Sequence, residues 1–176
     1  MTIEPDTKDW TWVLSRRCPD CGFDAATVEP GSLAARLRTS ATTWRVVLSR
    51  DDATVRPAAD TWSPLEYGCH VRDVHRVFDE RVRRMLTEDG PAFASWDQDA
   101  TAVEDRYDLQ DPTAVADELA AAAERVAERY AGVPVEAWTR TGRRSDGSLF
   151  TVASIGRYHL HDVVHHLHDV GADVGS

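Results

Sequence analysis

Residues 63–86 read SPLEYGCHVRDVHRVFDERVRRML, and their apolar side chains recur every three or four positions. This spacing is typical of an amphipathic helix with one buried face. The start is marked by Ser63 as a candidate N-cap, Pro64 in the first turn and Glu66 as the partner in a capping box. The apolar stripe consists of Tyr67, Val71, Val74, Phe78, Val82 and Met85. We therefore predict a long helix over this stretch that ends near Leu86.

Three further segments show the same helical pattern of apolar residues. They extend from about Ser32 to Arg50, from near Asp111 to about Tyr130, and from near Thr151 to about Val170. The connections at 51–62 and 90–110 are polar, and residues 133–150 suit either a short strand pair or a plain loop. Four amphipathic helices with such links predict an all-α fold, an antiparallel four-helix bundle with at least one long connection.

The first 29 residues differ from the rest because they show no sustained period. We expect an irregular N-terminal arm here, packed on the bundle by Trp10 and Trp12. A chain of 176 residues is long enough to bury one core. We therefore predict a single domain over 1–176, with the arm at 1–29 and the bundle at 30–172.

The net charge of −10 limits the classes of partner. A surface this negative repels phosphate backbones and anionic lipid, so we expect neither nucleic acid nor a membrane as a partner. No apolar run approaches the ~18–20 residues of a membrane span, and the acidic, polar stretch Met1–Trp10 carries no secretory signal. These features predict a cytoplasmic location. Three cysteines, an odd and small number, argue against a disulfide scaffold.

The seven histidines all fall in two of the predicted helices. His161 and His165 are four residues apart, which places two imidazoles on one helix face within reach of one ion. His70 lies at the inner edge of the apolar stripe of residues 63–86 and is the candidate third ligand, because a metal can satisfy a buried ring nitrogen. Three neutral imidazoles suit zinc or nickel, with iron or cobalt as alternatives, and leave positions open for water or a thiol. The competing interpretation is a solvated or core-satisfied histidine cluster.

Other residues of the second predicted helix have candidate roles around this site. Glu66 and Asp73 lie one turn either side of His70, so they could orient its second nitrogen, and Glu66 could itself be a ligand. Arg81 lies about three turns along nearly the same face and could bind an anionic substrate or a cofactor carboxylate. For Arg81 we favour the competing interpretation, an ion pair at the surface or at an interface.

The Cys18-Pro19-Asp20-Cys21-Gly22 segment in the arm is similar to half a zinc knuckle or to a redox pair. A second Cys-x-x-Cys is absent from the sequence, and Cys69 alone cannot complete a site of four cysteines. Histidine partners are conceivable. We favour a plainer interpretation, a tight turn whose two small residues pack under the tryptophans.

Two of these segments together resemble the DinB-like superfamily. They are Glu66-Tyr67-Gly68-Cys69-His70-Val71-Arg72-Asp73-Val74 followed by Arg81, and His161-Asp162-Val163-Val164-His165-His166-Leu167 followed by Asp169-Val170. The segment from Cys18 to Asp24 is similar to an actinobacterial branch of that superfamily. The resemblance covers about residues 30–172 and implies a four-helix bundle, often a homodimer. It also implies one divalent metal ion held by His70, His161 and His165.

The superfamily includes thiol S-transferases that use bacillithiol or mycothiol, and mycothiol-dependent maleylpyruvate isomerases. The resemblance therefore implies an enzyme that activates a low-molecular-weight thiol cosubstrate for reaction with a small electrophile. Lys8 is the only lysine among 20 basic residues, and this arginine-rich composition favours mycothiol over bacillithiol. The alternatives are a metal-dependent hydrolase and a non-catalytic, metal-stabilised bundle that binds a ligand. The lack of a general-base Glu beside His161 counts against the hydrolase.

Overall fold

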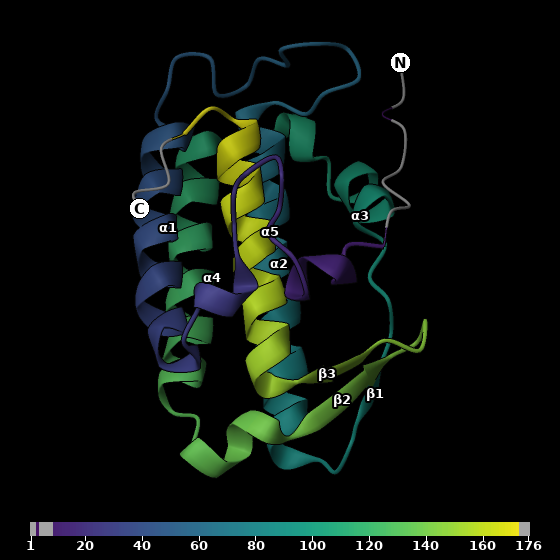
Figure 1. Ribbon diagram of the computed structural model, residues 1–176. Helices are drawn as coiled ribbons and strands as arrows, with labels where there is room; N and C mark the ends of the chain where they lie inside the picture. Colours follow the sequence, from purple (N-terminus) through teal and green to yellow (C-terminus); the bar gives the residue numbers. More distant parts are fainter. Residues whose placement is uncertain (1–2, 4–8, 173–176) are drawn as a thin grey trace.

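Four long helices dominate the computed structural model, which describes residue 3 and residues 9–172 (Figure 1). They are α1 (Leu33–Leu48), α2 (Pro64–Thr87), α4 (Pro112–Ala131) and α5 (Val152–Asp169). Each begins and ends within two residues of the segment that the sequence predicts, so the four-helix bundle is confirmed. Residues 1–2 and 4–8 of the expected arm and residues 173–176 lie outside the described residues.

The caps explain why these boundaries follow the sequence so closely. Ser63 accepts a hydrogen bond from the backbone N–H of Glu66, and the Glu66 carboxylate accepts one from the backbone N–H of Ser63, which confirms the predicted capping box. Asp111 and Thr151 cap α4 and α5 in a similar way, each accepting from a backbone N–H three residues on. Such side chains satisfy N–H groups that have no partner within the helix.

Neighbouring helices of the bundle are not all antiparallel, which corrects the prediction. Helices α2 and α4 are parallel, since Arg72 pairs with Glu118 and, further along both helices, Asp79 pairs with Arg129. Contacts between α2 and α5 run in opposite directions, and so do those between α1 and α4. As Figure 1 shows, α1 and α5 therefore point one way while α2 and α4 point the other. The long connection between α2 and α4 makes this order possible, because it returns the chain to the end where α2 began.

A small sheet corrects the all-α prediction. It consists of β1 (Ala92–Phe93), β2 (Thr141–Arg144) and β3 (Leu149–Thr151). The β2–β3 hairpin realises the strand pair expected within 133–150, and β1 joins β2 in parallel. The short α3 (Gln98–Glu104) also lies in the connection expected to be a plain polar link. Strand pairing between residues some 50 positions apart leaves no local periodic signal, so the sequence pattern did not predict β1.

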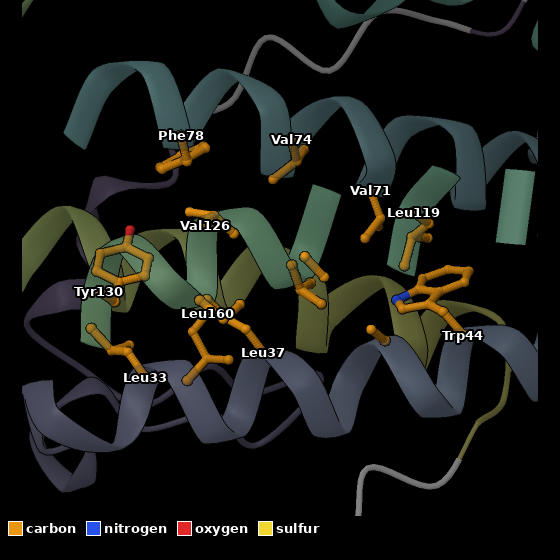
Figure 2. Close-up of a cluster of buried hydrophobic side chains, with 14 of the residues drawn as sticks. Leu33, Leu37, Trp44, Val71, Val74, Phe78, Leu119, Val126, Tyr130 and Leu160 are labelled. Carbon is orange, nitrogen blue, oxygen red and sulfur yellow. The ribbon is translucent and has the colours of Figure 1, made fainter. Parts of the chain in front are cut away.

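The core fills the space between the four long helices (Figure 2). Its largest buried side chains include Trp44 from α1, Leu119 and Tyr130 from α4, and Leu160 from α5. Burying one such side chain stabilises the fold by about 1.5–3 kcal/mol. The bundle is therefore a rigid support for the polar side chains at its edges.

The N-terminal arm lies across α5 on the outside of the bundle (Figure 1). It consists of the short 3-10 helices η1 (Thr11–Leu14), η2 (Ala25–Thr27) and η3 (Pro30–Ser32) with irregular links, as predicted. Two more 3-10 turns, η4 (Tyr107–Leu109) and η5 (Val135–Thr139), flank α4. In the arm, Val13, Cys18 and Val28 are buried, and Trp12 packs against the core. No helix in the described part of the chain has the length and apolar character needed to cross a membrane.

Candidate metal centre

Helix α5 presents two pairs of potential ligands, each pair four residues apart. Asp162 and His166 form one pair, and His161 and His165 form the other, one residue earlier. A step of one residue turns the side chain by about 100° around a helix, so the two pairs face different neighbours. The first pair faces α2, and the second faces the N-terminal arm.

The pair facing α2 meets His70. The His70 Nε2 atom lies 3.3 Å from Asp162 Oδ1, and His166 Nε2 lies 3.6 Å from the same oxygen. One ligand atom from each of the three residues lies within 4.8 Å of those of the other two. A second carboxylate in this region, Asp169, accepts from His166 Nδ1 at 2.8 Å. This bond turns the other ring nitrogen of His166 toward the cluster.

Aromatic rings enclose this three-residue cluster. The His70 ring stacks on Trp96 with centroids 5.4 Å apart, and the centroid of the Trp62 ring lies 5.6 Å from that of His70. Tyr67 packs 5.0 Å from the ring of His166. His70 is fully buried, whereas Asp162 and His166 are about one-quarter and one-fifth exposed. The cluster is thus shielded on the α2 side and accessible from α5.

The pKa values of His70 and Asp162 favour the protonation states that bind a cation. Burial lowers the pKa of His70, so its imidazole is neutral and can donate a lone pair. Burial alone would raise the pKa of Asp162, but hydrogen bonding to His70 and the nearby histidines hold it below its ordinary value, so the carboxylate is charged. Two imidazoles beside one carboxylate form a donor set that divalent transition metals prefer. The residues present therefore fit a divalent metal ion.

The predicted ligand set is divided between two clusters. His70 joins Asp162 and His166, whereas His161 and His165 join Cys18 and Cys21. Within the described residues, His70, His161 and His165 do not share one cluster of ligand atoms. Both the sequence and the structure place candidate ligands on α2 and α5, but the α5 residues grouped with His70 are Asp162 and His166 rather than His161 and His165. The ligand set itself stays a prediction.

Two signals for these residues were present in the sequence. Asp162 and His166 have the same spacing of four as His161 and His165, and a carboxylate is as suitable a ligand as an imidazole for several metals. The Cys-x-x-Cys of the arm also lacked two partners that a His-x-x-x-His pair could supply. Neither signal by itself shows which pair faces which neighbour.

Glu66 and Asp73 have other roles than those expected. The Glu66 carboxylate caps α2 at Ser63 and forms an ion pair with Arg56. Asp73 accepts hydrogen bonds from Arg72, Arg76 and the hydroxyl group of Tyr107. The His70 Nδ1 atom, which these carboxylates were expected to orient, is buried and has no hydrogen-bond partner among the described residues.

Arg81 is buried rather than placed in a surface ion pair, which corrects the interpretation that we favoured. Its side chain lies near the rings of Phe78 and Phe93, and Nη2 donates to the carbonyl oxygen of Ala94 at 3.0 Å. Burial lowers the pKa of Arg81 to about 10, so the guanidinium is still protonated at neutral pH. Within the described part of the chain, no carboxylate oxygen lies close enough to Arg81 to form an ion pair.

A cavity of about 650 Å³ connects these features. Asp162 and His166 of the three-residue cluster line it, together with Arg81. Its aromatic lining consists of Trp10, Trp62, Tyr67, Phe78, Trp96 and Tyr158. The cavity therefore combines candidate metal ligands, a buried cation and apolar walls, which is the composition of a small-molecule site.

The remaining histidines lie away from this cavity. His75 and His159 are fully buried and share a hydrogen bond of 2.9 Å between His75 Nδ1 and His159 Nε2. His168 is exposed near the end of α5. These three are structural or solvated residues and provide internal controls for experiments on the clusters.

Comparisons with known proteins agree with this architecture. The chain resembles the solved structure of YfiT from Bacillus subtilis, described as a probable metal-dependent hydrolase with an unusual four-helix bundle topology. The TM-score is 0.70 at 18% sequence identity, covering 82% of this chain and 89% of that one. This likeness establishes the shared fold. No curated protein matches the sequence. The model of the DinB superfamily matches residues 33–170, from the start of α1 to just past α5, and the chain is therefore a member of the DinB superfamily.

Proposed function

We propose that His70, Asp162 and His166 bind one divalent metal ion, and that the adjoining cavity is the active site of a metal-dependent thiol S-transferase or isomerase. The observation that carries this proposal is the convergence of three ligand atoms within 4.8 Å beside a cavity of about 650 Å³. Three protein ligands leave coordination positions for an exogenous group, which is the arrangement of catalytic rather than structural sites.

The donor set supports a metal of intermediate softness. Two imidazoles and one carboxylate suit zinc, nickel, iron or cobalt. A bound ion of this kind would lower the pKa of a coordinated thiol or water. Asp169 supports the site from outside, because its bond to His166 Nδ1 fixes the orientation of that ring.

The chain's own residues determine which small molecules fit. Arg81 supplies a buried positive charge that an anionic substrate, such as a carboxylate, would balance. Trp62 and Trp96 cover the face of the site around His70 and exclude water from it. A cavity of this volume can hold a thiol cosubstrate and a small electrophile together. We propose mycothiol as the thiol on the basis of the arginine-rich composition.

A metal-dependent hydrolase is the second candidate. The donor set of two histidines and one carboxylate also occurs in zinc hydrolases, and YfiT is described as a probable metal-dependent hydrolase. Hydrolysis needs a base to accept a proton from water, whereas a thiol deprotonated at the site is itself the nucleophile. The cavity lining contains the carboxylates Asp60, Asp97 and Asp99, which are candidates for that base. We rank thiol transfer first because of the resemblance to the thiol-using members of the superfamily.

The test measures metal content and activity on the same untagged protein. Wild type, His166→Ala and His168→Ala are each reconstituted with zinc or nickel and then assayed for thiol consumption with monochlorobimane as the electrophile. We expect His166→Ala to lose about one metal equivalent and more than about 100-fold of the activity, because it removes a direct ligand. His168→Ala, an exposed histidine on the same helix, should match wild type.

Other outcomes separate the alternatives. Ester cleavage without thiol, lost in His166→Ala, would favour the hydrolase. Unchanged metal content in His166→Ala would contradict the proposed metal site. Metal binding without either activity would leave a ligand-binding bundle and contradict the enzyme assignment.

A further inference from the structure

A second group of metal-ligating side chains lies where the N-terminal arm crosses α5. One ligand atom from each of Cys18, Cys21, His161 and His165 lies within 4.8 Å of the other three. We propose that these four residues bind one zinc ion that joins the arm to α5. This site is separate from the His70 cluster and does not depend on the function proposed above.

The cysteine side of the site is a tight turn. The backbone N–H of Cys18 donates to the carbonyl oxygen of Phe23 at 2.8 Å, and the N–H of Gly22 donates to that of Cys18 at 3.0 Å. Gly22 has a φ of +74°, a conformation that side chains other than glycine rarely adopt. Arg17 fixes the turn further by donating to the carbonyl oxygen of Gly22. The turn brings two thiols three residues apart close together, as in a zinc knuckle.

The histidine side is fixed by the helix. His165 Nδ1 lies 3.7 Å from Cys18 Sγ, while His165 Nε2 faces Asp169 Oδ1 at 3.8 Å. Ligand atoms around a tetrahedral zinc lie about 3.3–3.8 Å apart, given bonds of about 2.0–2.3 Å. The carboxylate behind the second ring nitrogen is a common support for a zinc-bound histidine. His161 Nε2 is buried and has no hydrogen-bond partner among the described residues, a cost that a bound metal removes.

The chemistry of the four donors points to zinc in a structural role. Two thiolates and two imidazoles form the tetrahedral set of structural zinc sites, and four protein ligands leave no position open for a substrate. Cys18 is fully buried and His161 almost so. The rings of Trp10 and Phe23 pack 5.7 Å and 5.4 Å from the ring of His161 and cover the site.

The alternatives account for fewer of these features. A redox pair accounts for the two thiols but not for the two histidines that lie beside them. All three cysteines are free, so no disulfide explains the proximity of Cys18 and Cys21. A tight turn packed under the tryptophans, the interpretation favoured from the sequence, leaves the buried nitrogen of His161 unexplained.

A zinc ion here would also support the other cluster. Asp169 lies between the two groups, near Nε2 of His165 on one side and bonded to Nδ1 of His166 on the other. Fixing His165 on zinc would therefore hold Asp169 in place, and Asp169 would orient His166. The arm that carries the two cysteines also contributes Trp10 to the cavity wall.

The test replaces zinc with cobalt(II), whose absorption spectrum reports its ligands. Wild-type protein, kept reduced and stripped of metal with a chelator, is titrated with cobalt(II). We expect sulfur-to-metal charge-transfer bands in the near ultraviolet and the intense visible bands of a tetrahedral site. The absorbance of these bands should reach half its maximum at a low cobalt(II) concentration. Zinc should displace the cobalt and abolish these bands. An absence of charge-transfer bands in folded wild-type protein would overturn the proposal.

Variants assign the bands to residues. Cys21→Ser and His165→Ala should lose the charge-transfer bands and about one zinc equivalent by elemental analysis. His70→Ala should keep those bands, because it belongs to the other cluster, and Cys69→Ser should keep them because Cys69 lies elsewhere on α2. Charge-transfer bands that survive in Cys21→Ser, or disappear in Cys69→Ser, would contradict the assignment. The wild-type cobalt titration remains decisive if a variant does not fold.

Discussion

At the scale of single residues, the histidines of this protein differ in what their second ring nitrogen contacts. Asp169 accepts a hydrogen bond from Nδ1 of His166 and lies near Nε2 of His165. The Nδ1 atom of His70, in contrast, has no hydrogen-bond partner among the described residues. His75 is fully buried, and its Nδ1 atom is bonded to another histidine, His159. Burial penalises the charged form of an imidazole, so the environments of His70 and His75 favour neutral rings.

His75 makes the stability of the fold sensitive to acid. Burial lowers its pKa from 6.5 to about 4. Because the folded state holds this proton less tightly than the unfolded chain, stability is full above about pH 6.5 and declines as the pH falls toward 4. The full difference corresponds to about 3 kcal/mol. Thermal unfolding between pH 7 and pH 4.5 should therefore show a smaller decrease in Tm for His75→Asn than for wild type.

Asparagine is a suitable replacement because its side-chain oxygen can keep the hydrogen bond to His159 without titrating. Loss of any bound metal in acid affects both proteins, so the difference between their Tm curves isolates His75. Equal slopes for the two proteins would show that this ring does not titrate on unfolding.

The candidate ligands were predictable from the sequence only up to their register on α5. Residue type and spacing pointed to α2 and α5 as the helices that carry a candidate metal site, because ligand pairs four apart lie on one helix face. The choice between Asp162 with His166 and His161 with His165 depends on the rotation of α5 against its neighbours. That rotation is set by packing across the bundle, which no local pattern encodes.

At the scale of elements, the helices were predictable because their signals are local. Caps such as Ser63 and Thr151 and the apolar spacing lie within a few residues of each boundary. The sheet and the direction of α4 were not predictable in this way. They depend on strand pairing between β1 and β2 and on the path of the connection between α2 and α4, both of which join distant parts of the chain.

Gly156 shows how closely α5 approaches its neighbours. A Cβ atom at this position would lie 2.5 Å from Leu33 Cδ1 of α1 and 3.1 Å from Tyr130 Cε1 of α4. Alanine is a better helix former than glycine by about 1 kcal/mol, but overpacking a core costs about 1–3 kcal/mol. Leu33 and Tyr130 are both buried and have little room to move. We expect Gly156→Ala to lower the free energy of unfolding by about 1 kcal/mol in urea denaturation.

Gly31→Ala is the matched control, because no atom lies within 4 Å of a Cβ atom at that position. Its stability should be within about 0.5 kcal/mol of wild type. A stabilised Gly156→Ala variant would show that helix propensity outweighs the close approach, and that α5 can move away from α1 and α4.

At the scale of the whole molecule, the protein consists of a four-helix bundle with its own core and an N-terminal arm that packs on α5. The bundle has a continuous apolar core from all four long helices (Figure 2). The arm contributes fewer large side chains to that core and meets α5 at the group of Cys18, Cys21, His161 and His165. A metal that binds the folded state alone stabilises whatever its ligands connect. Removing it should therefore loosen the arm before the bundle.

Hydrogen exchange followed by mass spectrometry measures this difference directly. After chelation at neutral pH, peptides covering residues 11–28 should lose most of their protection, because two of the four ligands lie in this segment. Peptides from α4 (Pro112–Ala131) should keep theirs, since this helix contributes no residue to either cluster. Cys18→Ser should show the same exchange pattern without a chelator, since it lacks one thiolate ligand. Protection lost equally from the arm and α4 would mean that metal stabilises the fold as one unit. Protection unchanged in both would mean that packing of Val13 and Val28 alone holds the arm on the bundle.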